Sequence, residues 1–452
     1  MSQRNVAVST SSPTLFSFGL GALLFGLSAL TVGASVGCES VNHESIEKWQ
    51  RTEKGPAKLL DVLRSDKSAE LRAHAAQVLI RLQKVDAVTT ALGSANDSDR
   101  ERIVTALIPR LVKDSEVIGK MTMPTAEQSQ AKDALFEIRS LASDSSRAEI
   151  DGYLVRWLTG GFYEGRAKVG RNSGKKLIRT IGLRAGPSLV ELAQVVLASP
   201  ENADGKFPRI GDELLDALAF CGHPDALNLL LNLAEKKQRD PSLSKRAMNA
   251  LYQAVLKPVG IEPLPGQRLT PVVKRLEAMA KNESLGARLA NDAVDLLAAV
   301  GMPDCLEPFV SIVSYPHSSE AFRYIGTQRG IRCGGVDAIV PITEAMPTAV
   351  PYPRDILNKY LWREVAALPA RKLVAERARL LLDSDSWVAR VTGIELLGML
   401  KLKEFASEDA KKIAKLAKDR TTLRKWYGAD SKRADPTLGQ LALRTASELA
   451  KL

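Results

Sequence analysis

The chain has few of the residue types that build most catalytic and metal sites. Among its 452 residues are four cysteines and four histidines, and aromatic side chains make up 5%. No Cys-x-x-Cys, His-x-x-His or His-Glu-x-x-His spacing occurs, so neither a redox motif nor a local zinc site is predicted. The scarcity of aromatics, with abundant leucine and alanine, indicates a core of aliphatic helix contacts and disfavours an aromatic-rich β-sheet.

Two partial matches to catalytic motifs fail on spacing or position. Residues 170–176 (Gly-Arg-Asn-Ser-Gly-Lys-Lys) can be compared with a phosphate-binding loop, but three residues instead of four separate the glycines, and Lys176 stands where Ser or Thr would hold magnesium. A Gly-x-Ser-x-Gly pattern at residues 33–37 lies inside an N-terminal apolar segment, away from any strand-to-helix turn. We therefore expect no catalytic residue, no metal and no cofactor.

The cysteines beyond Cys38 are too few and too far apart for a disulfide framework. They are Cys221, Cys305 and Cys333, an odd number with wide spacing. We expect all three to be buried as small hydrophobic side chains. A pair between Cys305 and Cys333, which are the least separated, is the alternative in an oxidising compartment.

The N-terminal 38 residues carry the most informative pattern. One basic side chain, Arg4, and no acidic one precede an uncharged apolar stretch at residues 15–37, which ends in small residues directly before Cys38. A basic leader, an apolar core and a small-residue end are typical of a secretory signal peptide. Residues 35–38 (Ser-Val-Gly-Cys) resemble the lipobox of bacterial lipoproteins, in which a peptidase cuts before a cysteine that carries lipid, although Ser35 replaces the usual leucine.

This resemblance implies a location for the protein. It implies a signal peptide at residues 1–37, lipidation of Cys38 and a short tether at residues 38–43. The remaining chain would then be attached to a membrane of a bacterial cell envelope, outside the cytoplasm. An uncleaved transmembrane anchor, or a signal that is cleaved without lipidation, is the alternative, because about 20 apolar residues can span a bilayer.

Size and charge restrict the class of protein further. Removing 37 residues from 452 leaves 415, more than one compact core usually accommodates, so several domains or a repeat array are expected. The net charge of +11 becomes +10 when Arg4 is removed. For an exported protein, a basic balance favours anionic lipid, an envelope polymer or an acidic protein as partner, and disfavours nucleic acid.

A ten-residue pattern recurs along the chain. Residues 218–227 and 297–306 share Leu, Ala, Gly, Pro, Asp and Leu, and residues 330–339 keep the glycine and the aspartate. Weaker copies start at Leu79 and Leu397. Glycine after a helix supplies the left-handed backbone that ends it, and an aspartate at the start of the next helix can accept its free amide hydrogens. The unit is therefore a helical hairpin, which must stack on neighbours to cover its apolar faces. The expected structural caps are Asp86, Asp225, Asp304 and Asp337.

The helices expected around Arg72 and Arg390 resemble the first helix of HEAT repeats. In each, the arginine is followed three residues later by a small residue, Ala75 or Gly393, which allows close approach of a neighbouring helix. We expect the two arginines to bond the preceding turn. The resemblance implies an all-α fold, an α-α superhelix of stacked helical hairpins (HEAT-like repeats), preceded by the N-terminal signal or anchor segment.

Loops divide the expected array into blocks. Four stretches rich in glycine, proline or charge interrupt the pattern at residues 160–174, 258–271, 343–353 and 426–436. The resulting blocks of HEAT-like repeats cover residues 44–160, 175–257 and 268–452. Insertions of this kind usually lie on one face of a solenoid, which is often its binding face.

The C-terminal region is dense in positive charge. Its possible docking strip consists of Lys411, Lys415, Lys418, Arg424 and Lys425. The three lysines follow helical spacing and would share one face. The strip is either a solvated outer face of a terminal repeat or a surface that docks on anionic lipid or an acidic protein. Trp426 beside it is either an exposed anchor or part of the core.

Together these features predict a non-catalytic, envelope-attached HEAT-repeat lipoprotein. Its expected role is a scaffold that presents a long concave groove to a protein or peptide partner, since each repeat adds contact area without a deep pocket. Two alternatives remain. One is an enzyme or enzyme accessory, because certain helical-repeat proteins act as lyases, and the other is a structural link between membrane and envelope polymer.

Overall fold

The computed structural model describes residues 40–65, 67–119, 122–198, 210–236, 240–317, 319–428 and 431–452. The predicted signal peptide at residues 1–37 and the predicted lipid site at Cys38 lie outside these residues. Residues Asn42–Leu452 form one compact unit, distinct from Met1–Val41. The subdivision into three blocks stays a prediction.

The described residues are built from helices. They contain one isolated antiparallel bridge, between Thr422 and Thr437, and no strand. The first half of the array contains α1 (His43–Trp49), α2 (Gly55–Arg64), α3 (Ala69–Arg81), α4 (Val85–Ser94), α5 (Asp97–Ser115), α6 (Ala126–Ile138), η1 (Arg139–Leu141), α7 (Asp144–Thr159), α8 (Tyr163–Arg166), α9 (Gly174–Ile181), η2 (Gly182–Ala185), α10 (Gly186–Ala198), α11 (Asp212–Cys221) and α12 (Pro224–Glu235). The predicted all-α class is confirmed.

The second half of the array continues in the same way. It contains α13 (Pro241–Leu256), η3 (Gly266–Val272), α14 (Val273–Lys281), η4 (Glu283–Leu285), α15 (Gly286–Val300), α16 (Leu306–Ser314), α17 (Glu320–Gly334), η5 (Gly335–Ala338), α18 (Ile339–Glu344), α19 (Pro353–Leu357), the π-helical turn η6 (Asn358–Trp362), α20 (Arg363–Ala366), α21 (Arg371–Leu381), α22 (Trp387–Leu400), η7 (Lys403–Phe405), α23 (Ala406–Ala414), η8 (Lys415–Lys418) and α24 (Leu438–Leu449).

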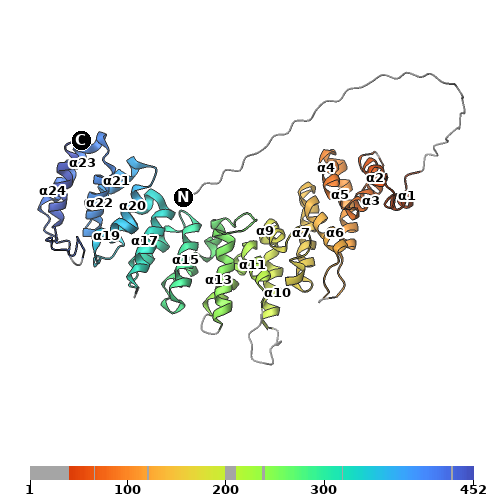
Figure 1. Cartoon of the computed structure of the whole chain (residues 1–452), viewed down its shortest axis with the longest axis horizontal. Coiled ribbons are helices and arrows are strands. Elements are labelled where there is room, and N and C mark those ends of the chain that lie inside the picture. Colours follow the sequence, from red (N-terminus) through yellow and green to blue (C-terminus); the bar gives the residue numbers. More distant parts are fainter. Residues whose placement is uncertain are drawn as a thin grey trace, which may run out of the picture. The chain divides into compact units, whose positions relative to one another are not determined.

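Neighbouring helices pack against one another in chain order (Figure 1). From α9 onward they form two rows. In the first row α9, α11, α13, α15, α17, the η6–α20 segment, α22 and α24 each contact the next member. In the second row α10 contacts α12, and α12 contacts η3, which leads directly into α14. From there α14, α16, α18 and α21 each contact the next member. The predicted stack of helical hairpins is confirmed, and we call the first series the first row below.

The turns of the repeat form as the sequence pattern predicts. Gly222 follows α11 with φ of +63°, and Gly301 follows α15 with φ of +84°. Both angles lie in the region that disfavours side chains, so glycine is the residue that can end these helices without strain.

The two arginines of the HEAT-like helices bond the preceding turn. Arg72 Nε donates to the carbonyl oxygen of Leu63 at 2.9 Å, and Arg390 Nη1 donates to that of Ser384 at 2.8 Å. Both bonds satisfy carbonyl groups at or just beyond a helix end, which has no intrahelical donors for them. Gly393 allows close packing, because a Cβ atom there would lie 2.7 Å from a backbone oxygen of α21. These expectations are confirmed.

One apolar run in the described residues is long enough to cross a membrane. It covers Gly174–Ala198, with a mean hydropathy of 1.3 in its most apolar window. The 3₁₀ turn η2, in which Gly182 has φ of +68°, divides this run into α9 and α10. The two halves pack on α11 and α12 respectively, so the run belongs to the stack.

The cysteines correct the sequence prediction. Cys305 and Cys333 form a disulfide with their Cα atoms 6.6 Å apart, whereas Cys221 is buried and free. The bond joins the residue before α16 to the last turn of α17. The expectation of three unpaired buried cysteines was wrong, because the antiparallel packing of α16 on α17 brings together residues that are 28 apart in the sequence.

A buried ion pair holds the loop that was compared with a phosphate-binding loop. Lys132 on α6 has 1% of its side chain exposed, and its Nζ lies 2.7 Å from Asp133 Oδ1. The same Nζ donates to the carbonyl oxygens of Val169 and Asn172 at 3.0 and 2.7 Å. Burial lowers the pKa of Lys132, and Asp133 opposes that effect. The lysine therefore needs its carboxylate and both carbonyls.

Asp133 also occupies the amides of this loop. Its carboxylate accepts hydrogen bonds from the backbone N–H groups of Arg171 and Asn172, next to Gly170, which has φ of +86°. Backbone amides that could cradle an external anion are thus bonded to an internal one.

Replacement of Asp133 by alanine should strongly destabilise the protein. The change leaves Lys132 buried without a counter-ion, which costs about 3–5 kcal/mol of unfolding free energy. Urea unfolding followed by circular dichroism measures the effect. The matched control is Asp144→Ala, which removes a carboxylate that is 96% exposed and paired with Arg147, and should change stability by less than about 0.5 kcal/mol. Equal effects of the two substitutions would contradict the assigned role of the buried pair.

The disulfide gives a second prediction. After denaturation without reductant, a thiol reagent should label Cys221 and leave Cys305 and Cys333 unlabelled, and reduction should expose both. Denaturation is required because burial raises the pKa of the Cys221 thiol to about 12. The double substitution to serine should lower the unfolding free energy by about 3–4 kcal/mol, the chain-entropy value for a loop of this length. Labelling of Cys305 or Cys333 before reduction would refute the bond.

Candidate functional site

The exposed face of the first row carries ion pairs that bridge successive helices. Most partners are separated by 32 to 34 residues, about one repeat. We name this series the ion-pair ladder; its members are Lys175–Asp216, Asp212–Arg246, Asp295–Arg329, Arg332–Glu364 and Glu395–Arg444. Each pair links neighbouring members of the first row, so the ladder follows the stacking direction.

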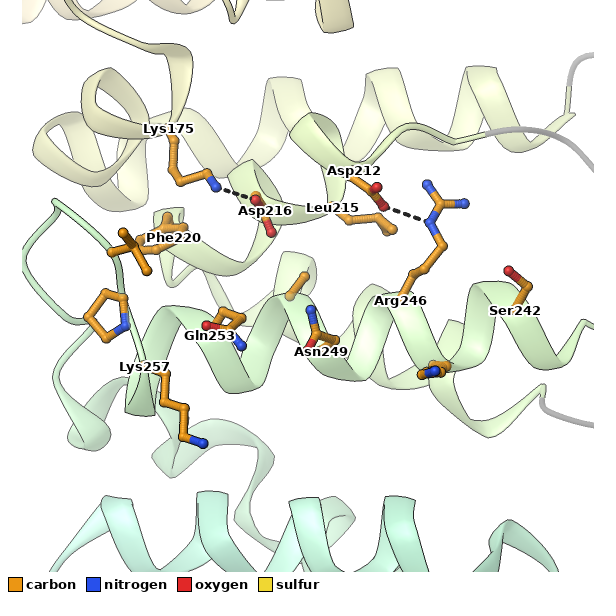
Figure 2. A pocket seen from close by; sticks show the side chains of 14 residues that line it. Lys175, Asp212, Leu215, Asp216, Phe220, Ser242, Arg246, Asn249, Gln253 and Lys257 are labelled. Atoms are coloured by element: carbon orange, nitrogen blue, oxygen red, sulfur yellow. Dashed lines mark hydrogen bonds and ion pairs between the residues drawn. The ribbon is translucent and has the colours of Figure 1, made fainter.

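An open pocket of about 540 Å³ lies on this face between α11 and α13 (Figure 2). We call it the α13 groove. Its lining comes from α9, α11, α13 and the segment directly after α13: Lys175, Asp212, Leu215, Asp216, Phe220, Ser242, Lys245, Arg246, Asn249, Ala250, Gln253, Lys257, Pro258 and Val259. Figure 2 shows that the pairs Lys175–Asp216 and Asp212–Arg246 lie at different ends of the groove.

The sequence of α13 explains which of its side chains reach the groove. Pro241 begins the helix, and the Asp240 side chain accepts the hydrogen bond of the Leu243 N–H at 2.9 Å. Apolar residues at helical spacing, such as Ala247 and Leu251, are fully buried against neighbouring helices. The opposite side of this 16-residue helix is therefore left to polar residues along its whole length.

The wall formed by α11 is fixed by a carboxylate at its first turn. Glu164 of α8 accepts hydrogen bonds from the backbone N–H groups of Glu213 and Leu214, both at 3.1 Å. Burial raises the pKa of Glu164, and these two hydrogen bonds oppose the increase. A carboxylate at this position accepts hydrogen bonds from the amides at the start of the helix, and its negative charge interacts favourably with the helix dipole. Glu164 thus binds the first turn of α11, the helix from which Asp212 and Asp216 reach the groove.

The groove has more cations than anions. Its lining contains four basic side chains and two carboxylates, so four minus two gives a net charge of +2. Arg246 Nε lies 2.6 Å from Asp212 Oδ1, and Lys175 pairs with Asp216. Lys245 and Lys257 have no ion-pair partner among the described residues; Lys257 Nζ lies 5.6 Å from the ring centroid of Tyr252.

Uncharged polar groups in the groove are also available. The side chains of Ser242, Asn249 and Gln253 have no hydrogen-bond partner within the described part of the chain. Asn249 is exposed and Gln253 is half-buried. The floor is apolar but covered, since Leu215 and Ala250 are 1% and 2% exposed. The groove thus offers polar groups and two cations that lack an ion-pair partner in the described chain. It has little exposed apolar surface apart from Val259, which is 88% exposed.

The predicted basic strip is exposed, and of its five residues Lys411 alone lines a described pocket, which lies between α23 and α24. Lys411 lies on α23, Lys415 and Lys418 lie on the 3₁₀ turn η8, and the remaining strip residues lie in the loop after it. All five side chains are exposed. Trp426 is 1% exposed and its ring lies 6.1 Å from that of Trp362, so it belongs to the core. Asp435 accepts hydrogen bonds from the backbone of the loop that carries Trp426, which fixes this loop on the fold.

The predicted aspartate caps require correction. At α12 the capping acceptor is the His223 side chain, which binds the Asp225 N–H at 3.2 Å. Among the described residues, α4, α16 and η5 begin without a side-chain capping bond. The other three aspartates contact different repeats: Asp86 with Arg171 (3.4 Å), Asp304 with Thr270 (2.8 Å) and Asp337 with Arg377 (3.1 Å).

The histidines form no metal cluster with other ligands in the described residues. His74 on α3 is buried, with 5% of its surface exposed. Its Nδ1 lies 2.8 Å from His43 Nδ1, and its Nε2 lies 2.8 Å from Glu47 Oε1. Burial lowers the pKa of His74, and the hydrogen bond to Glu47 opposes the decrease. These contacts join α1 to α3 and are structural.

Sequence reasoning missed the α13 groove. A local signal was present, because Ser242, Lys245, Asn249, Gln253 and Lys257 follow one another at spacings of three and four residues, which places them on one helical face. Such a face is also typical of ordinary solvated helices. The face of α13 differs from an ordinary solvated face because α11 lies beside it, and the position of α11 is known only from the structure.

Comparison with known proteins gives similarity to solved structures only. No protein-family model matches the chain, and no curated protein matches it. Similar solved structures include a mutant of Kap121p (11% identity, 89% of this chain, 41% of that chain, TM-score 0.28), Kap121p bound to Pho4p (11%, 89%, 42%, 0.27) and human deoxyhypusine hydroxylase in complex with glycerol (15%, 82%, 98%, 0.16). This chain spans less than half the length of the Kap121p chains. At these TM-scores, none of the three similarities bears on function.

Proposed function

We propose that the protein is a scaffold of the bacterial cell envelope, tethered through lipid on Cys38, that binds a protein partner in the α13 groove. The observation that carries the binding role is the groove itself, an open channel with polar side chains and two cations that lack partners among the described residues. A stack of hairpins provides such a surface without a closed cavity.

Two observations support the location. The apolar segment that ends at Cys38 has the order of a lipoprotein signal. The disulfide between Cys305 and Cys333 is of the kind that persists in oxidising compartments and is rare in the cytosol. Both favour a protein that is exported, and the first favours one that is held at a membrane.

Mass spectrometry of the protein purified from bacterial membranes tests the tether. We expect a mature chain that begins at Cys38 and carries lipid mass on that residue. Cys38→Ala should abolish the lipid mass and release the chain from membranes or leave residues 1–37 attached. The control, Cys221→Ala, should keep both lipid and membrane attachment. A native protein with an unmodified Cys38 would end the lipoprotein proposal.

Site-specific photo-cross-linking tests the scaffold role. A photoreactive residue in place of Asn249 should give an adduct of one defined mass in envelope membranes. The control position is Glu376, which is also exposed but lies on α21 in the second row. We expect no adduct at Glu376, because the proposed partner binds in the α13 groove. Absence of an adduct at Asn249, or equal adducts at both positions, would contradict binding in the α13 groove.

A further inference from the structure

The polar residues of α13 line the groove over the full length of the helix. Ser242 lies near one end and Lys257 directly after the other, fifteen residues apart. With a helical rise of 1.5 Å per residue, this distance is about 22 Å. A fully extended peptide covers it with about seven residues, at roughly 3.3 Å each. The groove thus has the length of a short linear segment.

Two amide side chains match the repeat of an extended chain. Asn249 and Gln253 are one helical turn apart, which places them about 6 Å apart along the helix axis. Alternate residues of an extended peptide are separated by roughly 6.6 Å, and their backbone groups on one side recur at that interval. Each side-chain amide offers one acceptor and two donors, the complement of a peptide unit. Neither amide has a side-chain partner in the described chain, so both are available.

The two cations without an ion-pair partner among the described residues define the charge of the occupant. Lys245 and Lys257 are twelve residues apart, or about 18 Å along the helix, which equals five to six extended residues. The two carboxylates of the groove are already held by Arg246 and Lys175. An incoming acidic side chain therefore meets two lysines that have no ion-pair partner in the described part of the chain, Lys245 in the second turn of α13 and Lys257 directly after the helix. Charge complementarity favours a segment with two acidic residues at that separation.

The surface fits an extended occupant better than a helical one. Recognition of an amphipathic helix needs an exposed apolar groove for anchors at i, i+4 and i+7. The apolar floor here is covered, since Leu215 and Ala250 are 1% and 2% exposed. The exposed apolar surface is confined to one end, at Val259. That end can accept a single apolar residue beside one of the acidic positions.

We infer that the α13 groove binds an acidic linear segment of a partner protein in extended conformation. The main chain of the segment contacts Asn249 and Gln253, and its acidic side chains contact Lys245 and Lys257. This inference rests on the proposed scaffold function and specifies the chemistry of its partner.

Fluorescence anisotropy with the mature chain and a labelled synthetic peptide tests the inference. The peptide carries two glutamates separated by four or five serine and threonine residues, with a valine beside one glutamate. Binding should weaken about tenfold or more in the variant Lys245→Glu/Lys257→Glu, because two attractive contacts become repulsive. Asn249→Ala/Gln253→Ala keeps the charge and should weaken binding several-fold. A peptide with lysines in place of the glutamates should not bind.

The matched control is Lys411→Glu/Lys418→Glu, which makes the same charge change on the basic strip and should leave peptide binding unchanged. Equal loss in this control means that general charge attraction holds the peptide, which overturns the inference. Binding of a single-stranded oligonucleotide or of phosphatidylglycerol vesicles that is lost in the groove variant, without peptide binding, overturns it as well. A specific cross-link at Asn249 together with failure of the acidic peptide would retain the scaffold and reject this partner chemistry.

Discussion

The structure depends on one constraint, namely that each helical hairpin covers its aliphatic faces only by packing on the next hairpin. Small residues set the contact distance, as at Gly393, where any side chain would meet the backbone of α21. The backbone groups at helix ends must then find their hydrogen-bond partners within the stack. Arginines at corresponding places do this by donating to carbonyls of the preceding turn: Arg72 to Leu63, Arg323 to Val313 and Arg390 to Ser384. Each hairpin of the stack is thus stabilised by contacts with its immediate neighbours.

Because the apolar faces are buried between hairpins, the polar side chains lie on the outer faces of the rows. There they form the ion-pair ladder, whose members contribute little to stability, about 0–1 kcal/mol each for exposed pairs. Their effect is geometric, because each pair joins a helix to its counterpart in the next repeat. On α13, Lys245, Asn249 and Gln253 have no hydrogen-bond or ion-pair partner among the described residues and line the groove beside two pairs of the ladder.

Local patterns in the sequence predicted the local features of the fold. The hairpin turns at Gly222 and Gly301 and the bonds of Arg72 and Arg390 follow from residues close in the chain. Features that depend on distant residues were missed or misassigned. The burial of His74 results from α1, about thirty residues earlier, and the disulfide requires α16 to pack on α17. The aspartate caps failed because His223 accepts the first amide at α12, and because Asp86, Asp304 and Asp337 bond residues of other repeats.

The α13 groove could not be predicted for a related reason, and that reason bears on how it can work. Its walls come from three helices that pack on one another, and two ion pairs link them: Lys175 of α9 with Asp216 of α11, and Asp212 of α11 with Arg246 of α13. Glu164 further fixes the first turn of α11. Groove side chains that are already held by such contacts lose less conformational entropy on binding, so an open surface without a deep pocket can still be selective. The ladder thus contributes to recognition by fixing the positions of the free groups between its pairs.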